Sequence, residues 1–137
     1  MPQSRRALLL ILVLLAAAGA GCGASGQRKN ALRPPSPIII SVQIGENHVS
    51  ASPTKFGAGP ITIITSNQSS ASHTLTIDGP RLKQSVGPIN PEDTATLKVV
   101  VKPGEYMLSA DGSTSVTPAK LTVGPKRPSA QNKLLEP

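Results

Sequence analysis

Short runs of apolar residues separated by polar turn residues fill the chain between positions 38 and 124. The alternation is clearest where Leu97, Val99 and Val101 share one parity while Lys98 takes the other. Successive side chains on a strand face opposite sides, so one parity can line a core while the other meets water. Val100 is an exception to the alternation. The pattern predicts strands at 38–44, 60–67, 72–78, 93–102, 105–110 and 119–123, with weaker segments at 48–51 and 81–86.

Seven or eight short strands with turn signals between them predict an all-β sandwich or barrel. The composition agrees, because Phe56 and Tyr106 are the only aromatic residues and the core must come from Ile, Val and Leu. On the expected strand around Tyr106, Leu108 and Ala110 share its parity and should face inward. Met107 has the opposite parity and should face away from the core.

The N-terminus has the pattern of a secretory signal. A basic start is followed by an apolar stretch, 7–20, whose fourteen residues would span only about 21 Å as a helix. That is too short for a bilayer core of about 30 Å. The run Gly19-Ala20-Gly21-Cys22 resembles the lipobox of bacterial lipoproteins. The resemblance implies a cleaved signal peptide at 1–21, a lipid on Cys22, and a place outside the cytoplasmic membrane, anchored to it. The lone cysteine has no partner for an intramolecular disulfide.

The positive charge of the chain lies mainly outside the expected strands. The net charge is +7, but six basic residues balance six acidic ones between 38 and 124. We expect a flexible tether at 22–37 and a disordered basic tail at 125–137. A nucleic-acid surface on the domain has little support. Two interpretations of the basic segments stay open: contact with anionic lipid or wall polymer, and plain solvation.

Two stretches resemble the cupredoxin-like family. The first, 61–79, is a strand, an Asn, a polar loop, then His73 and alternating apolar residues that end in Asp. The second, 90–110, has a Pro-acid-Thr lead into a strand, then Pro-Gly-x-Tyr and the next strand. The resemblance implies a small Greek-key β-sandwich over 38–124.

In copper-binding members of that family, two His, one Cys and usually a Met hold the metal, a trigonal set with a weak axial ligand. His73 matches the first His, and it shares the core-facing parity of Leu75. The family's thiolate position falls on Ala110, six residues after Gly104. The following loop, DGSTSVTPAK, holds neither His nor Met. The resemblance therefore implies no blue-copper site, and we expect no cofactor.

Other candidate ligands are weaker. His48 lies in a turn-like stretch, where a solvated His is the ordinary case, and His73 could bond a loop carbonyl or water instead of a metal. We expect no catalytic residues, because neither His has an adjacent nucleophile motif and no phosphate-binding glycine loop occurs. Glu92 and Asp93 are interpreted as turn residues. Asn67-Gln68-Ser69 matches a glycosylation sequon, a pattern that arises often by chance.

These observations predict a membrane-anchored protein that is not an enzyme, with a binding or interaction domain. Its expected partners are membrane lipid through Cys22 and an envelope protein, a wall polymer or a small solute. The alternative is a metal-handling envelope protein that uses His73 in an atypical site.

Overall fold

The computed structural model describes residues 34–112 and 115–129, and this part of the chain is all-β. The expected signal helix and Cys22 lie outside the described residues. The strands are β1 (Ile38–Ile44), β2 (Val49–Ser52), β3 (Lys55–Asn67), β4 (His73–Gly79), β5 (Leu82–Ile89), β6 (Thr94–Val101), β7 (Gly104–Gly112) and β8 (Ala119–Lys126). The predicted all-β fold is confirmed. The described residues contain no helix that is long and apolar enough to span a membrane.

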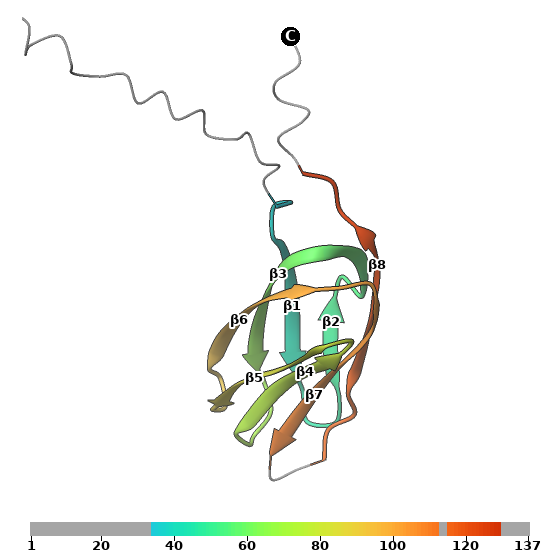
Figure 1. The fold of residues 1–137 in the computed structure, drawn as a ribbon. Coiled ribbons are helices and arrows are strands. Elements are labelled where there is room, and N and C mark those ends of the chain that lie inside the picture. The colour runs from blue at the N-terminus through green and yellow to red at the C-terminus, as the bar shows by residue number, and fades with distance from the viewer. Residues whose placement is uncertain (1–33, 113–114, 130–137) are drawn as a thin grey trace, which may run out of the picture. The chain divides into compact units, whose positions relative to one another are not determined.

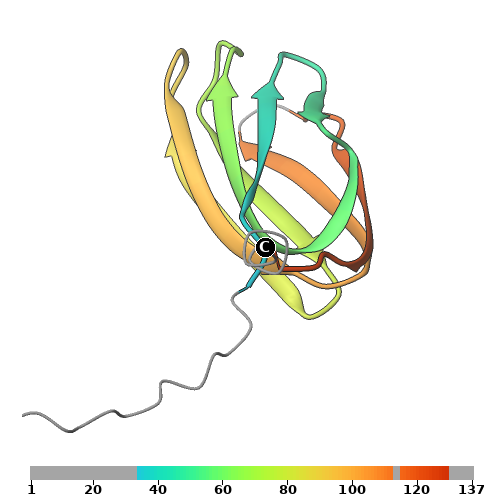
Figure 2. The same ribbon diagram turned by 90° about the horizontal axis from the view of Figure 1, so that it is seen from above.

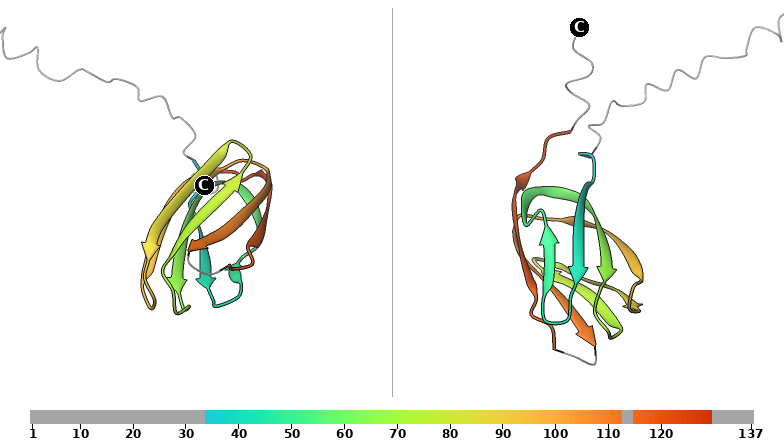
Figure 3. Two further views of the ribbon diagram at one scale, coloured as in Figure 1. Left: turned by 90° about the horizontal axis from the view of Figure 1, so that it is seen from below. Right: turned by 180° about the vertical axis from the view of Figure 1, so that it is seen from behind.

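The long strand β3 joins the two layers of the sandwich. Its first residues, from Lys55 to Ala58, pair in parallel with β8. Its remainder pairs in parallel with β1 and antiparallel with β6. The strand order is β2-β1-β3-β8-β7-β4-β5, and β6 lies beside β3 outside this path (Figure 1). The strands of the two layers enclose a common core, as the further views show (Figure 3).

Side-chain parity on β6 and β7 follows the prediction. Val99, Val101, Tyr106, Leu108 and Ala110 are buried, and the outward-facing Met107 is 42 % exposed. The parity exception Val100 is 69 % exposed. Leu97 faces inward but is only partly buried, because it lies near the rim of the sheet.

Several strands are longer than the sequence pattern indicates, β3 and β5 above all. β3 begins at Lys55 rather than at residue 60, because Gly57 and Gly59 allow other groups to approach its backbone closely. β5 is a full strand that runs to Ile89. Gly87 in β5 has a φ of +150°, and a Cβ there would lie 2.9 Å from the Cα of Thr74. The glycines of both strands make room for groups that pack against the backbone, Arg127 and Pro35 at β3 and Thr74 at β5, and such positions leave no apolar pattern.

The strands run between two ends of the domain. The entry end holds residues 34–37, at the top of Figure 1, together with the turns 53–54, 102–103 and 80–81, the last of which lies lower in that view and packs against 102–103. The loop end, at the bottom, holds the connections 45–48, 68–72 and 90–93 together with residues 115–118. Figure 2 looks down on the entry end, where β1 begins and β8 finishes.

Tyr106 fixes two turns of the entry end. Its hydroxyl accepts a hydrogen bond from the Lys102 backbone N–H at 3.0 Å, and it lies 3.1 Å from the Lys102 carbonyl and 3.5 Å from the Pro80 carbonyl. Its ring covers Gly79, where a Cβ would lie 2.2 Å from the ring. A Cβ at Gly104 would lie 2.6 Å from the Pro80 ring. The turns 80–81 and 102–103 therefore pack directly against each other.

Arg127 attaches the segments before β1 and after β8 to the sandwich. β8 continues to Lys126 rather than ending before residue 125. The guanidinium of Arg127 then donates to the carbonyls of Ser36, Gly57 and Pro60, at 2.6, 3.0 and 2.6 Å. Pro35 is buried and contacts the backbone at Gly59. The last residues of the expected tether and the first residues of the expected tail therefore belong to the folded domain.

Candidate binding site at the loop end

Asn67, the last residue of β3, organises the loop end from inside. Its side chain is fully buried. The amide nitrogen donates to the carbonyls of Ala71 and Ile89, at 2.7 and 2.9 Å. The amide oxygen accepts from the backbone N–H and the hydroxyl of Ser69, at 3.0 and 2.7 Å. An Asn side chain offers two donors and one acceptor group, so this residue is fully used. It fixes the 68–72 connection and leaves no amide hydrogen for modification at the sequon.

Glu46 ties the same connection to the β1–β2 turn. Its carboxylate accepts from the backbone N–H of Ser70 at 2.8 Å and from the Ser70 hydroxyl at 3.2 Å. Hydrogen bonds to a carboxylate are stronger than those between neutral groups. On the other side, the Ser72 hydroxyl donates to the Asn90 side chain at 2.9 Å. Three connections are therefore held together by polar side chains.

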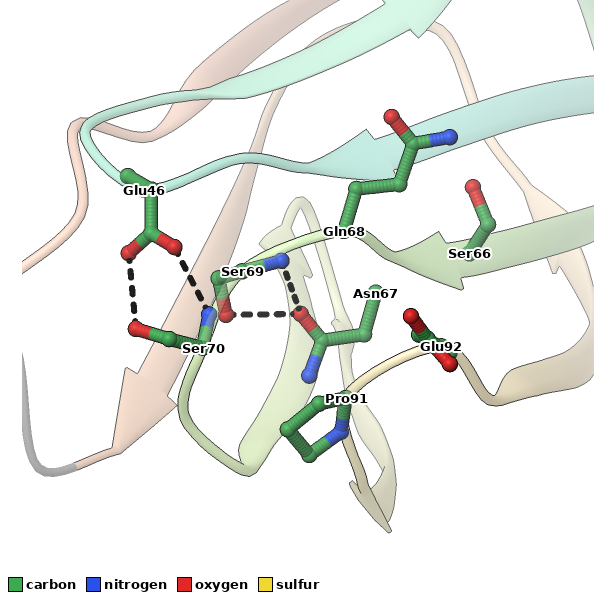
Figure 4. Close-up of a pocket in the computed structure, with 8 residues that line it drawn as sticks. All are labelled: Glu46, Ser66, Asn67, Gln68, Ser69, Ser70, Pro91 and Glu92. Atoms are coloured by element: carbon green, nitrogen blue, oxygen red, sulfur yellow. Dashed lines mark hydrogen bonds between the residues drawn. The ribbon is translucent and has the colours of Figure 1, made fainter.

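A polar cleft of about 600 Å³ opens between these connections. Its lining comes from the three connections and the end of β3: Glu46, Ser66, Asn67, Gln68, Ser69, Ser70, Pro91 and Glu92 (Figure 4). Gln68 also pairs through its side chain with Gln43 of β1. The polar groups that face the cleft are hydroxyls, amides and carboxylates, and they alternate with apolar surface that includes the Pro91 ring. Such a lining can hydrogen-bond a hydrophilic ligand that is neutral or positively charged.

His73 begins β4 and faces the interior just below these loops. It is 1 % exposed, and neither ring nitrogen has a hydrogen-bond partner among the described residues. The hydrogen bond to a loop carbonyl that the sequence allowed is not made by these residues. The ring lies against Gly112, its register partner on β7, where a Cβ would lie 2.6 Å from Nδ1. Glycine at position 112 is what gives this imidazole its room.

The other candidate ligands do not converge on His73. Ala110, in the thiolate position, is buried and pairs with Leu75, next along the sheet from the His73–Gly112 pair. His48 is exposed on the β1–β2 turn, and Met107 lies on the outer face of β7. No group of three or more His, Cys, Asp or Glu side chains lies together in the described part of the chain. Alanine has no lone pair for a metal, so the residues present do not fit a blue-copper centre.

The strand arrangement and the placement of His73 and Ala110 agree with the family resemblance. The described strands form a small β-sandwich, as that resemblance implies. The chain is similar to auracyanin from the photosynthetic bacterium Roseiflexus castenholzii, with 18 % identity and a TM-score of 0.48 over 66 % of this chain and 99 % of that one.

Two copper enzymes have similar structures. The blue copper oxidase from Nitrosomonas europaea has 17 % identity and a TM-score of 0.49, over 74 % of this chain and 43 % of the oxidase. The copper-containing nitrite reductase from Thermus scotoductus has 14 % identity and a TM-score of 0.48, over 72 % and 29 %. This chain therefore spans less than half the length of either enzyme. Likeness at this level of identity concerns the fold and not the chemistry.

No protein-family model matches the sequence. No curated protein matches it either.

Sequence reasoning located His73 and the absent thiolate, but it missed the two residues that shape the cleft. Asn67 carried a local signal, because an Asn followed two residues later by Ser can form a side-chain turn of the kind seen here. Glu46 carried none, since its partner Ser70 is 24 residues away. Only the fold brings these two residues together.

Proposed function

We propose that this protein is a lipid-anchored envelope protein whose cupredoxin-like domain binds a hydrophilic partner at its loop end, without catalysis. The observation that carries the proposal is the polar cleft at the end of the domain opposite to the entry of residues 34–37. A lipid on Cys22 would attach through the entry end. The cleft would then face away from the membrane, where an envelope protein, a wall polymer or a small solute can reach it.

The cleft supports a hydrophilic ligand more than an apolar one. Ligand sites for drug-like molecules are mostly apolar. This cleft is instead bordered by serines, amides and the carboxylates of Glu46 and Glu92. The hydrogen bonds of Asn67 and Glu46 hold its walls in place before binding, which lowers the ordering cost of association. Neutral and cationic polar groups are the favoured occupants.

The anchor is tested directly on Cys22. Cells that grow with labelled palmitate should incorporate the label into the wild-type protein, and Cys22→Ala should abolish it. Mass spectrometry of the purified chain should show the acylated residue at the mature N-terminus. Label that persists in Cys22→Ala would refute the anchor.

The binding surface is tested with a photo-crosslinking residue placed at one exposed position at a time. A probe at Gln68, in the cleft, should capture the partner in native membranes. A matched probe at Thr54, at the entry end, should not capture it. Glu46→Ala should reduce the capture at Gln68, because it frees the 68–72 connection. Equal capture from both probes would contradict a site at the loop end.

One observation favours a second function, the handling of a metal ion. His73 is a buried imidazole with two unpartnered ring nitrogens, a state that costs free energy and needs an explanation. One imidazole without a thiolate cannot give the intense absorption of copper–thiolate bonding. Titration with copper(II) should therefore give no blue band. A rise of several degrees in the melting temperature with stoichiometric copper, lost in His73→Ala, would favour metal handling over the first proposal.

A further inference from the structure

The balanced charge of the domain hides a separation of charge between its two ends. The loop end carries acidic residues in two of its connections, 45–48 and 90–93, and at the end of β7. These residues are Glu46, Glu92, Asp93 and Asp111, all exposed. No Lys or Arg lies in the described connections of this end.

The entry end carries the opposite charge. Its exposed cations are Lys55, Arg81, Lys102 and Lys126. The acids nearest to this end are already paired within the described residues, Asp78 with Lys83 at 2.9 Å and Glu105 with Lys120 at 3.0 Å. The guanidinium of Arg127 adds a further charge, which backbone carbonyls hold in place. The entry end therefore has a net positive surface.

These cations lie on fixed parts of the fold. Arg81 and Lys102 lie on the two turns that Tyr106 holds together. Lys55 and Lys126 lie at opposite ends of the β3–β8 pairing. Val101, the neighbour of Lys102, pairs with Gly59, which contacts both Arg127 and Pro35. The positive groups thus surround the point at which the chain enters the domain.

We propose that the entry end is a membrane-facing surface, which holds the domain against anionic lipid headgroups with the loop end pointing outward. The inference rests on the proposed Cys22 anchor, since the anchor brings this end to the bilayer. Basic residues near an anionic leaflet are attracted to it within about a Debye length. That length is about 8 Å at physiological salt.

The distance between the two ends decides which end of the domain is attracted to the bilayer. β1 has 7 residues and runs from the entry end to the loop end, a length of about 23 Å. The acids of the loop end therefore lie more than about two Debye lengths from a bilayer that touches the entry end, and their repulsion is largely screened. The inverted orientation would place those acids against the anionic lipid. An anionic wall polymer could also meet the cations, but the chain enters on this face, which favours the bilayer.

The test uses the acylated protein in lipid nanodiscs, with a fluorescent label on one introduced cysteine. Thr54→Cys reports on the entry end and Asn47→Cys on the loop end. Discs with about one third anionic phosphatidylglycerol and a quencher on the lipid should quench the Thr54 label and leave the Asn47 label bright. Phosphatidylcholine discs, or about 1 M salt, where the Debye length falls to about 3 Å, should remove that quenching.

Charge variants identify the surface. Arg81→Gln combined with Lys102→Gln should lower the affinity of the Thr54 face for the anionic disc at least about tenfold, since each basic residue near the surface contributes about fivefold. Lys98→Gln on the outer face of β6 removes one charge away from the entry end and should have little effect. Equal quenching in both lipids, stronger quenching at Asn47, or capture of soluble polyphosphate without lipid quenching would each overturn the proposal.

Failure of the anchor is distinguishable from failure of the surface. Mass spectrometry shows first whether Cys22 is acylated. If it is not, the two labels are placed on the Cys22→Ser chain, which is added to the same discs at increasing concentration. Quenching of the Thr54 label that depends on anionic lipid and is lost in the double variant then supports the surface without the anchor. No such quenching overturns the surface as well.

Discussion

At both ends of the domain, polar side chains hydrogen-bond the backbone, but only the loop end also holds a buried polar side chain, His73, without a partner among the described residues. At the entry end, the side chains of Tyr106 and Arg127 make hydrogen bonds to backbone groups. At the loop end, Asn67 does the same for the 68–72 connection. Next to Asn67, however, His73 is buried with two ring nitrogens that have no partner among the described residues. The polar side chains that organise the entry end are hydrogen-bonded, whereas the loop end keeps a buried imidazole without a partner among the described residues.

This difference separates structural polar residues from a candidate functional one. A buried polar group without a partner costs about 1–3 kcal/mol. Natural proteins keep such costs mainly where a function requires them. The entry end shows none of this cost at Tyr106, whereas the loop end shows it at His73. The predictions below test whether the two ends differ in this way.

The largest effect is expected at Asn67. Asn67→Ala removes one hydrogen bond each from the carbonyls of Ala71 and Ile89 and from the Ser69 N–H, and it leaves the Ser69 hydroxyl as the other partner of Ala71. The free energy of unfolding should fall by about 3 kcal/mol or more, because each stranded group costs about 1–3 kcal/mol. Urea denaturation followed by circular dichroism measures the change. The exposed Asn47→Ala is the matched control and should stay within about 0.5 kcal/mol. A small effect at Asn67 would mean that the loops do not depend on it.

A smaller loss is expected at the entry end. Tyr106→Phe keeps the buried ring but removes the hydroxyl that bonds the Lys102 backbone. The stability should decrease by about 1–3 kcal/mol, because the Lys102 N–H loses its partner. Thermal unfolding of the two proteins gives the difference. No change would show that water replaces the hydroxyl and that the two turns are not locked by it.

The sequence predicted which side chains face the core wherever apolar and polar residues alternate along a strand. The parity of Tyr106, Leu108 and Ala110 placed the core face of β7 correctly, and the parity of His73 with Leu75 placed the imidazole inside. The start of β3 was missed because Gly57 and Gly59 carry no apolar side chain. A glycine at such a position makes room for a group that packs against the backbone, and that group can be identified only in the folded structure.

The contacts at the two ends of the domain could not be predicted from local sequence patterns, because they join residues that are far apart in the sequence. Arg127 and Ser36 are 91 residues apart, and Arg127 stands in a basic, proline-rich segment that is typical of solvated tails. Nothing near Arg127 indicates that its guanidinium meets three carbonyls. In the candidate site, the family resemblance gave the position of His73. The cleft beside it depends on Glu46 and Ser70, which no short motif connects.

A gain in stability is expected at His73. His73→Leu replaces a buried imidazole that has unpartnered nitrogens with an apolar side chain of similar size. The stability should rise by about 1 kcal/mol, since no polar group is then left without a partner. The same denaturation experiment as for Asn67 measures the change, and His48→Leu on the exposed turn is the control. A clear loss of stability would show that His73 has a structural partner, and would remove the contrast between the two ends.

The smallest effect concerns an ion pair in the entry half of the domain. The ammonium of Lys120 lies 3.0 Å from the Glu105 carboxylate, and this hydrogen bond holds the pKa of Glu105 below its ordinary value. A folded-state pKa below the unfolded one gives stability that is present above the unfolded pKa. That stability is lost as the pH falls through the folded pKa.

Lys120→Ala should therefore raise the pKa of Glu105 toward its ordinary value, as measured by carboxyl NMR titration. The acid side of the stability profile should become slightly flatter, because the exposed pair contributes little and is screened by salt. Lys98→Ala, which removes a lysine that makes no ion pair within the described residues, should leave the Glu105 titration unchanged. An unchanged Glu105 titration in Lys120→Ala would show that the pair does not persist in solution. Glu105 would then be an unpaired acid near the entry end, and the charge contrast between the two ends would be weaker than the structure indicates.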